Sequence, residues 1–306
     1  MRKYCTPQDF KDAELILKSL CVETNCFADG KIIRARYLVA IDDDPTSAFY
    51  AAYVYHLIYQ AYAYHPFVLC VGGKGPLSKY TNEKGESEGD RQKRVCLALG
   101  VQASDVRVLD KGTNTGENLL DIVLSMSSNP GRIIMCLTGR LSLRLRQTLL
   151  YLDRQYADRL DKLVFDEIMR QGVYYYVPEE SIDDQMQLYN CKGLAGGLLL
   201  LSEVASIYNR IRRYSGTLQA PLDFEVPQEV IEASRRLEDK YPLKNGKFGF
   251  TYVWQFIEAW SSVKWFKRQI RIDLSRAIKF NQRQLMEEFD FLGKTQYGLY
   301  VKRSLA

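Results

Sequence analysis

Four short apolar runs constrain the fold of this chain more strongly than any other feature of its 306 residues. Each run is followed by a polar turn and then by a segment in which apolar residues recur with helical spacing. Runs that are apolar throughout are typical of parallel strands covered on both faces, and alternating strands and helices produce right-handed crossovers. The sequence therefore predicts an α/β fold, a three-layer sandwich with a mostly parallel sheet between helices. The four runs are Tyr37–Ile41, Phe67–Val71, Val106–Leu109 and residues 133–137.

The later part of the chain is expected to differ in organisation. Residues 163–165 and 173–177 are interpreted as edge strands, and a helix is expected over residues 142–156. After about residue 180 the alternation ends, and from Phe248 onward many aromatic residues are interleaved with basic ones. We interpret residues 1–215 as an α/β domain with an N-terminal helix and residues 216–306 as a mainly helical extension. Its amphipathic helices could pack on the core or form a homodimer interface, and membrane-surface binding is the less favoured interpretation.

Composition and charge narrow the class of protein. The net charge of +5 is mild and no RNA- or DNA-binding signature is present, so we expect no nucleic-acid partner. The seven cysteines form no CxxC pair, which favours neither a zinc site nor a redox motif and fits a reducing cytoplasm. The apolar run at residues 198–201 is too short to span a bilayer, and the first residues do not resemble a signal peptide. We therefore expect a cytoplasmic protein without a membrane span.

Residues 110–118, Asp-Lys-Gly-Thr-Asn-Thr-Gly-Glu-Asn, connect the third predicted strand to the next helix. In open α/β sheets, ligands bind at the carboxyl ends of the strands. The small polar side chains of Thr113 and Asn114 suit a helix cap, and the free N–H groups of a helix start attract anions. Simple capping and ligand binding are both consistent with this pattern.

The turns after all four strands should meet at one edge of the sheet, where they could bind a ligand. Glycines there would let the backbone approach it closely, and Lys74 and Arg144 would supply positive charge. An aspartate of the first turn or Glu117 could hold ribose hydroxyls or a cation. Each feature also has a simpler explanation as a turn, a cap or a solvated charge. The candidate catalytic residues are Asp42 and Glu117, and the candidate ligand-binding residues are Gly72, Gly73, Lys74, Glu88, Thr113, Asn114, Asn118, Thr138 and Arg144.

Histidine chemistry is disfavoured at this edge. The chain has two histidines: His56 falls in the middle of a predicted helix, and His65 precedes a strand at the opposite edge of the sheet. No Ser–His–Asp or Cys–His arrangement can be built from them at the carboxyl edge. Any catalysis would have to use carboxylates, a lysine or a metal ion held by aspartates.

The order of these residues resembles a known family. Gly72-Gly73, then Ser87-Glu88, then Gly100-Val101, then Thr113-Asn-Thr-Gly-Glu-Asn118 is similar to the YdcF/SanA/ElyC family of bacterial proteins of unknown function. The resemblance covers roughly residues 36–215 and is closest to the soluble YdcF branch. It implies a Rossmann-like sandwich with a site at the same edge. The residues carried over are Gly72, Gly73, Glu88, Thr113, Asn114, Glu117, Asn118 and Arg144.

The resemblance also implies a ligand class. The YdcF branch is linked to an adenosyl nucleotide of the S-adenosylmethionine kind, and membrane-anchored relatives are linked to cell-envelope assembly. This chain departs from the pattern by carrying aspartates at residues 42–44, where many members have glycines, and by lacking a histidine after the fourth strand. Chemistry that depends on that histidine is not expected here.

Three functional hypotheses follow. The first is a nucleotide-binding protein that holds a small adenosyl or phosphorylated ligand at the sheet edge and could be a transferase. The second is a hydrolase of phosphoesters or sugar phosphates, in which the oxygen ligands of Mg²⁺ would come from Asp42, Asp43, Asp44, Asp110 and Glu117. The third is a non-enzymatic regulatory or assembly factor related to the cell envelope.

Overall fold

The computed structural model describes residues 6–41, 46–74, 86–178, 201, 204, 225–240, 289–291 and 300–302. The chain divides into two compact units, and each is described by itself. One unit contains the five-stranded sheet with most of its helices, and the other contains the first helix, the start of α6 and helix α11. The predicted boundary near residue 215 lies outside the described residues and stays a prediction. So does a dimer interface formed by the aromatic C-terminal helices.

A five-stranded, wholly parallel sheet forms the centre of the larger unit. The strand order β5-β4-β3-β6-β7 means that the chain starts at the middle strand, moves to one edge and then returns to build the other half. This is a doubly wound order, and its direction reverses between β3 and β6. The predicted three-layer α/β fold is confirmed. The strands are β3 (Tyr37–Ile41), β4 (Phe67–Val71), β5 (Val106–Leu109), β6 (Ile133–Cys136) and β7 (Val173–Tyr176).

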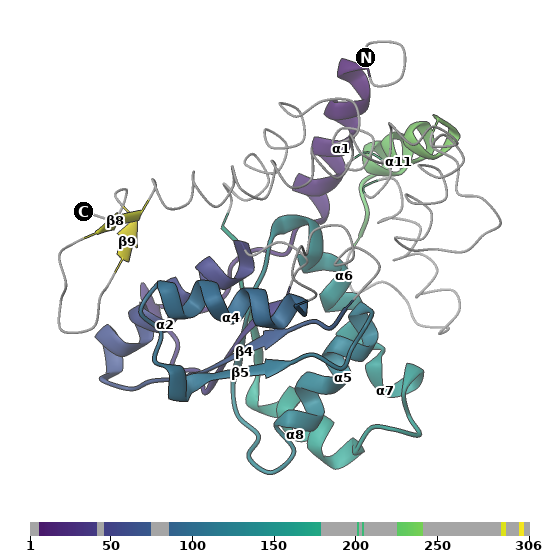
Figure 1. Ribbon diagram of the computed structural model, residues 1–306. Helices are drawn as coiled ribbons and strands as arrows, with labels where there is room; N and C mark the ends of the chain where they lie inside the picture. The colour runs from purple at the N-terminus through teal and green to yellow at the C-terminus, as the bar shows by residue number, and fades with distance from the viewer. Residues whose placement is uncertain are drawn as a thin grey trace. The chain divides into compact units, whose positions relative to one another are not determined.

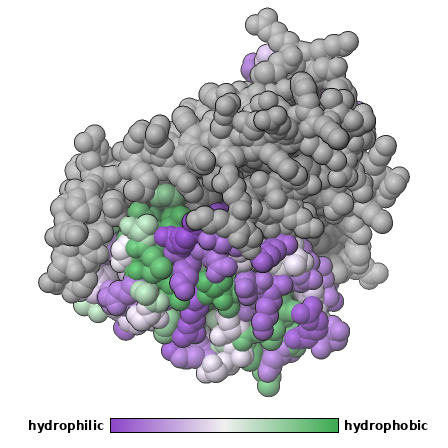
Figure 2. Space-filling view, viewed as in Figure 1, coloured by the Kyte–Doolittle hydropathy of each residue, from purple (hydrophilic) through white to green (hydrophobic). Residues whose placement is uncertain are grey.

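Helices cover both faces of this sheet (Figure 1). On one face lie α2 (Thr46–Tyr62) and α4 (Glu88–Ala98), and on the other lies α5 (Thr115–Ser125), which contacts β4 and β5. The short α7 (Leu152–Gln155) and α8 (Lys162–Gln171) contact α5. On the side shown in Figure 2, hydrophilic residues form most of the coloured surface.

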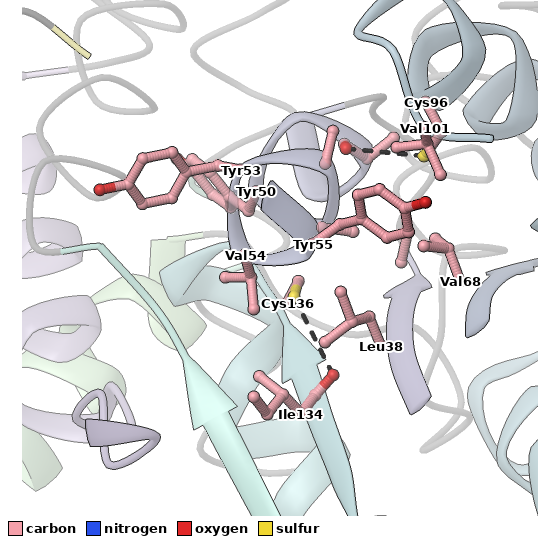
Figure 3. Packing of buried hydrophobic residues seen from close by; sticks show 14 of the residues in the cluster. Leu38, Tyr50, Tyr53, Val54, Tyr55, Val68, Cys96, Val101, Ile134 and Cys136 are labelled. Carbon is pink, nitrogen blue, oxygen red and sulfur yellow. Dashed lines mark hydrogen bonds between the residues drawn. The ribbon is translucent and has the colours of Figure 1, made fainter. Parts of the chain in front are cut away.

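The core between the sheet and α2 explains why the strands are apolar throughout. Alternate residues such as Leu38 and Val68 point from the sheet toward Tyr55 of α2 (Figure 3), and all three are almost fully buried. Two thiols fill small spaces in this layer and donate weak hydrogen bonds, from Cys96 Sγ to the Ala48 carbonyl at 3.7 Å and from Cys136 Sγ to the Ile134 carbonyl at 3.9 Å. They behave as small hydrophobic side chains.

Residues 163–165 form the first half of α8, and the prediction of an edge strand there was wrong. The Asp161 carboxylate caps this helix by accepting hydrogen bonds from the N–H groups of Leu163 and Val164 at 3.0 and 3.3 Å. Phe165 and Ile168, three residues apart, are its buried side chains. The helical period therefore outweighs the β propensity of the apolar triplet.

The second predicted edge strand is confirmed as β7. Its outer edge is covered by the segment that precedes β1 (Phe27–Ala28). Asn25 Oδ1 accepts from the Tyr175 N–H at 2.7 Å, and the Asn25 N–H donates to the Tyr175 carbonyl at 3.0 Å. The hydroxyl of Thr24 bonds the backbone of Val177 in the same way. These contacts protect an edge that would otherwise present unpaired backbone groups.

Two local features differ from the sequence-based expectation. The helix expected over residues 142–156 is divided into α6 (Gly139–Leu150) and α7, because Tyr151 leaves the helical conformation with φ −111° and ψ 9°. A small hairpin of β1 and β2 (Lys31–Ile32) occurs where only a loop was expected. Its two turn residues, Asp29 and Gly30, both have positive φ, which suits a tight hairpin turn.

The smaller unit is built on contacts between α1 (Pro7–Leu20) and α11 (Gln228–Lys240). Thr6 caps α1 in a capping box with Asp9, and Pro7 occupies the first helical position. The apolar side chains at the contact are buried. They are Ala13, Ile16, Leu17 and Leu20 of α1 with Val230, Ala233 and Leu237 of α11.

Two further short elements lie in the described residues. The strands β8 (Phe289–Phe291) and β9 (Tyr300–Lys302) pair antiparallel, and the 3₁₀ helix η1 (Ala103–Asp105) forms a single turn before β5. Within the described part of the chain, no helix has both the length and the apolar character needed to cross a bilayer.

Candidate functional site

The turns after β4 and β5 meet through their backbones at the carboxyl edge of the sheet. The Gly72 N–H donates to the Leu109 carbonyl at 2.9 Å, and the Gly73 N–H donates to the Gly112 carbonyl at 2.8 Å. Residues that are far apart in the sequence are thus held side by side directly after the last ladder positions of the two strands. Of the four strand exits that the sequence predicts to converge, the exits of β4 and β5 are joined in this way.

Three glycines allow the two turns to approach this closely, because a side chain at any of the three positions would clash with neighbouring atoms. A Cβ on Gly73 would lie 2.5 Å from the Asp110 carbonyl oxygen, and one on Gly112 would lie 2.2 Å from Asn118 Oδ1. Gly72 has φ +133°, and a Cβ there would lie 2.7 Å from Glu88 Oε2. The space beside each glycine is filled by the protein itself, so their first role is close packing of backbone.

The first turn of α4 is attached to the same turn. The N–H groups of Glu88 and Gly89 donate to the carbonyls of Gly73 and Gly72 at 3.2 and 2.8 Å. Ser87 caps the helix, since its Oγ accepts from the Asp90 N–H at 3.0 Å while Asp90 Oδ2 accepts from the Ser87 N–H at 3.2 Å. The Glu88 side chain lies at the rim beside Gly72, while Ser87 acts as a helix cap.

The first turn of α5 is organised by three residues of the 110–118 stretch. Asn114 is the N-cap, and its Oδ1 accepts from the Glu117 N–H at 3.1 Å. Glu117 Oε2 accepts from both the N–H and the hydroxyl of Thr113 at 2.8 Å. The backbone hydrogen bond from Thr113 is the main reason that the pKa of Glu117 is lowered. Thr113, Asn114 and Glu117 thus bind one another and cap the helix.

Behind this loop, α5 presents two oxygen atoms that are not satisfied within the described structure. Asn118 is 8% exposed, and its buried Oδ1 faces Gly112 without a hydrogen-bond donor. Asp121 Oδ2 is also buried without a donor, and burial raises the pKa of this carboxyl although the Gly112 backbone N–H bonds it. Asp121 was not among the candidates predicted from the sequence, because a single aspartate within an amphipathic helix normally faces solvent.

Tyr156, which was not predicted as a site residue, lies against the start of α5. The Tyr156 hydroxyl is 3.4 Å from Asn114 Oδ1, and a Cβ on Gly116 would lie 2.3 Å from that hydroxyl. Gly116 is therefore the residue that lets Tyr156 approach. The positive charge of Arg159, which lies 5.8 Å from the Tyr156 ring, acts on Glu117. In the sequence, Gly116 is the one sign of a close approach at this point, and it does not indicate that Tyr156 is the residue that approaches.

Four further candidates lie in other parts of the chain. Thr138 follows β6 and is fully buried, whereas Lys74 follows Gly73 and is exposed. Arg144 lies on the part of α6 that belongs to the other compact unit. Asp42 and its neighbours up to residue 45 lie outside the described residues. No group of three histidine, cysteine, aspartate or glutamate residues in the described ranges is placed to hold a metal ion.

The fold and the geometry define a doubly wound α/β protein whose β4 and β5 exits and α4 and α5 starts form one polar rim. No protein-family model matches the chain, and no curated protein matches it either. The likeness to the YdcF/SanA/ElyC family therefore rests on the residue pattern alone, and it enters below as a proposal.

Proposed function

We propose that this chain binds an adenosyl or phosphorylated nucleotide at the carboxyl edge of its sheet, with a ligand of the S-adenosylmethionine kind as the first to test. The observation that carries the proposal is the joining of the β4 and β5 exits with the starts of α4 and α5 through Gly72, Gly73 and Gly112. Doubly wound sheets bind nucleotides at this edge. The resemblance of the 110–118 stretch to the YdcF branch supports the same ligand class.

The start of α5 is the best-equipped place for an anionic group of such a ligand. The N–H groups of Thr115 and Gly116 make no hydrogen bond to any described residue, and they point out of the helix start. The positive charges of Lys111 and Arg159 act on the carboxyl of Asp121, and each opposes the rise in its pKa that burial causes. Unbonded N–H groups and the helix dipole together favour a phosphate or a carboxylate.

The reaction class that we propose is transfer of a group from the bound nucleotide. The carboxylates to examine are Asp42, as predicted from the sequence, and Glu117. Oε2 of Glu117 is occupied by Thr113, so in this arrangement Glu117 supports the loop more directly than it offers a base. Arg144 is assigned no role in the proposal, since it belongs to the other unit.

Thermal-shift and calorimetric titrations with S-adenosylmethionine, S-adenosylhomocysteine, ATP and AMP test the proposal. The sharpest variant is Thr115→Pro, because proline is tolerated at the first position of a helix and removes one of the unbonded N–H groups. We expect it to fold normally and to weaken ligand binding about tenfold, the loss for one hydrogen bond to a charged group. Lys162→Pro, the same change at the first position of α8, is the matched control and should bind normally.

The result of the titrations decides between the hypotheses. A folded protein that responds to none of these nucleotides would contradict the proposal. Hydrolysis of a phosphoester that requires Mg²⁺ and is lost in Asp42→Ala would favour the hydrolase instead. A homodimer that is lost on removing the residues after 248, without any ligand response, would favour the regulatory or assembly factor.

A further inference from the structure

Four arginines gather at the amino edge of the sheet, at the opposite end of the strands from the candidate site. Arg36 and Arg132 directly precede the neighbouring strands β3 and β6, and the Arg36 N–H donates to the Arg132 carbonyl at 3.0 Å. Arg107 is the second residue of β5, and Arg34 lies in the loop before β3. The parallel sheet thus brings together cations that are far apart in the sequence.

Aromatic rings hold two of these guanidinium groups in a continuous row. Arg107 Cζ lies 4.0 Å from the centre of the Phe67 ring, which stacks on Tyr37 at 6.0 Å between centres. Arg36 Cζ lies 5.8 Å from the centre of the Tyr37 ring, and the Tyr37 hydroxyl donates to the Asn129 carbonyl at 2.8 Å. The order along the edge is therefore guanidinium, ring, ring, guanidinium. Stacking on rings restricts the planar guanidinium groups while leaving their N–H edges available.

These arginines have no acidic partner among the residues that the structure describes. None of the four forms an ion pair there, although Asp105 lies only two residues before Arg107 in the chain. The Asp105 carboxylate instead accepts from the Tyr55 hydroxyl at 2.6 Å. Arg36 Nε is buried without an acceptor. A cation that is partly removed from water without a counter-charge is unfavourable, so an anion bound at this edge would stabilise it.

The spacing of the arginines indicates the kind of anion. Neighbouring strands lie about 4.8 Å apart, so the row from β5 to β6 extends over roughly 15 Å. One phosphate cannot contact all of it, whereas a chain of phosphates can. The guanidinium planes of exposed arginines such as Arg107 also offer stacking surfaces for bases, which an acidic peptide would not use. We propose that this arginine row, Arg36, Arg107 and Arg132 supported from below by the Tyr37–Phe67 pair, binds single-stranded nucleic acid through its phosphate backbone, although composition and motifs alone favour no nucleic-acid partner.

The test is fluorescence anisotropy of labelled oligodeoxythymidine and oligouridine with the full-length chain, titrated at several salt concentrations between about 50 and 200 mM. Arg36→Gln, Arg107→Gln and Arg132→Gln should each weaken binding about three- to tenfold. Each should also reduce the slope of log K against log salt by about 0.7, the value for one lost phosphate contact to a single strand. The triple variant should lose binding at the higher salt concentration.

Two controls separate a specific surface from general positive charge. Arg235→Gln removes the same charge from an exposed arginine of α11 and should leave the affinity unchanged. Arg107→Lys keeps the charge but loses the planar group over Phe67, and should still weaken binding several-fold. Thermal melts of each variant establish that it is folded.

Three results would overturn the inference. The first is unchanged affinity in the triple variant, and the second is an Arg235→Gln variant that loses as much affinity as Arg107→Gln. The third is equal competition by polyglutamate, which would assign the edge to an acidic protein segment. The test is independent of the nucleotide proposal, because Thr115→Pro at the opposite edge should bind oligonucleotides normally.

Discussion

Glu117 accepts two hydrogen bonds from Thr113, one from the backbone N–H and one from the hydroxyl group, both at 2.8 Å and both at Oε2. This pair closes the loop over the start of α5. Asn114 Oδ1 accepts a hydrogen bond from the N–H of Glu117 at the same time. The 110–118 stretch, which in the sequence looks most like a ligand-binding loop, therefore acts first as the cap of α5.

We expect Glu117→Gln to lower the free energy of unfolding by about 1 kcal/mol at neutral pH, because an amide oxygen is a weaker acceptor than a carboxylate. The pKa of Glu117 is lowered in the folded state, mainly by the Thr113 backbone bond, so its stabilisation is present above the ordinary pKa and is lost as pH falls through the lowered one. The difference between wild type and variant should therefore shrink below about pH 4. Urea unfolding at several pH values measures it, and a difference independent of pH would contradict the assignment.

Gly73→Ala should destabilise the protein by about 2 kcal/mol or more. The reason is space, since the new Cβ would meet the carbonyl oxygens of Asp110 and Gly112 at 2.5 and 2.6 Å. Gly30→Ala is the contrasting variant: nothing lies within 4 Å, but φ is +72°, so only the backbone penalty of about 1 kcal/mol should appear. Thermal unfolding that ranks Gly30→Ala as the more damaging change would show that the two turns do not pack as described.

The central strands and their connections are predictable from sequence because burial on both faces leaves an unmistakable apolar run. Residues 163–165 show the limit of that signal, since three apolar residues cannot distinguish a strand from the start of a helix. The deciding information was the Asp161 cap and the buried pair Phe165 and Ile168. The hairpin of β1 and β2 was missed because two residues are too few to show a period of two.

The candidate site was predictable only in part, for a different reason. A strand order places Gly72 and the 110–118 stretch at the same edge, but it does not say which atoms touch. That Gly73 bonds Gly112, or that Tyr156 reaches Asn114 over Gly116, depends on tertiary packing with no local pattern. The arginine row at the other edge was invisible for the same reason, because its members come from separate loops and strands.

His56 should make stability depend on pH near neutrality. Its side chain is buried in α2, and its Nε2 donates to the Leu99 carbonyl at 2.8 Å, so Nε2 carries a proton. Burial lowers the pKa of His56 in the folded state, so the unfolded chain binds the proton more readily as pH falls below about 6.5. Stability should then fall by up to about 1.4 kcal/mol per pH unit below that value, until the lowered pKa is reached.

The measurement for His56 is direct, because the chain has only two histidines. In a His65→Gln background the single imidazole signal in an NMR titration belongs to His56, and its midpoint should lie below 6.5. His56→Gln should remove most of the pH dependence of unfolding between about pH 5 and 7. A midpoint above 6.5 would mean that the ring is solvated or faces a carboxylate.

The bidentate pair of Asp12 on α1 and Arg236 on α11 should couple the two helices. Arg236 donates from Nε and from one terminal nitrogen at 2.9 and 2.8 Å, and Asp12 is 2% exposed. Although burial opposes it, the hydrogen bonds from Arg236 lower the pKa of Asp12, so this stabilisation exists above the ordinary aspartate pKa and is lost in acid. A double-mutant cycle with Asp12→Asn and Arg236→Gln should give a coupling of about 1–2 kcal/mol at neutral pH, less than for a fully buried pair because Arg236 is half exposed.

The matched control for this cycle lies on the same helix. Lys18 and Glu14 form an exposed ion pair at 2.8 Å one turn apart on α1, and such pairs couple by only about 0.3–0.5 kcal/mol. Added salt should weaken that small coupling while leaving most of the Asp12–Arg236 coupling, since a carboxylate removed from water is screened less. Equal couplings for the two pairs, or a complete loss of both in salt, would mean that the Asp12–Arg236 pair does not couple α1 to α11.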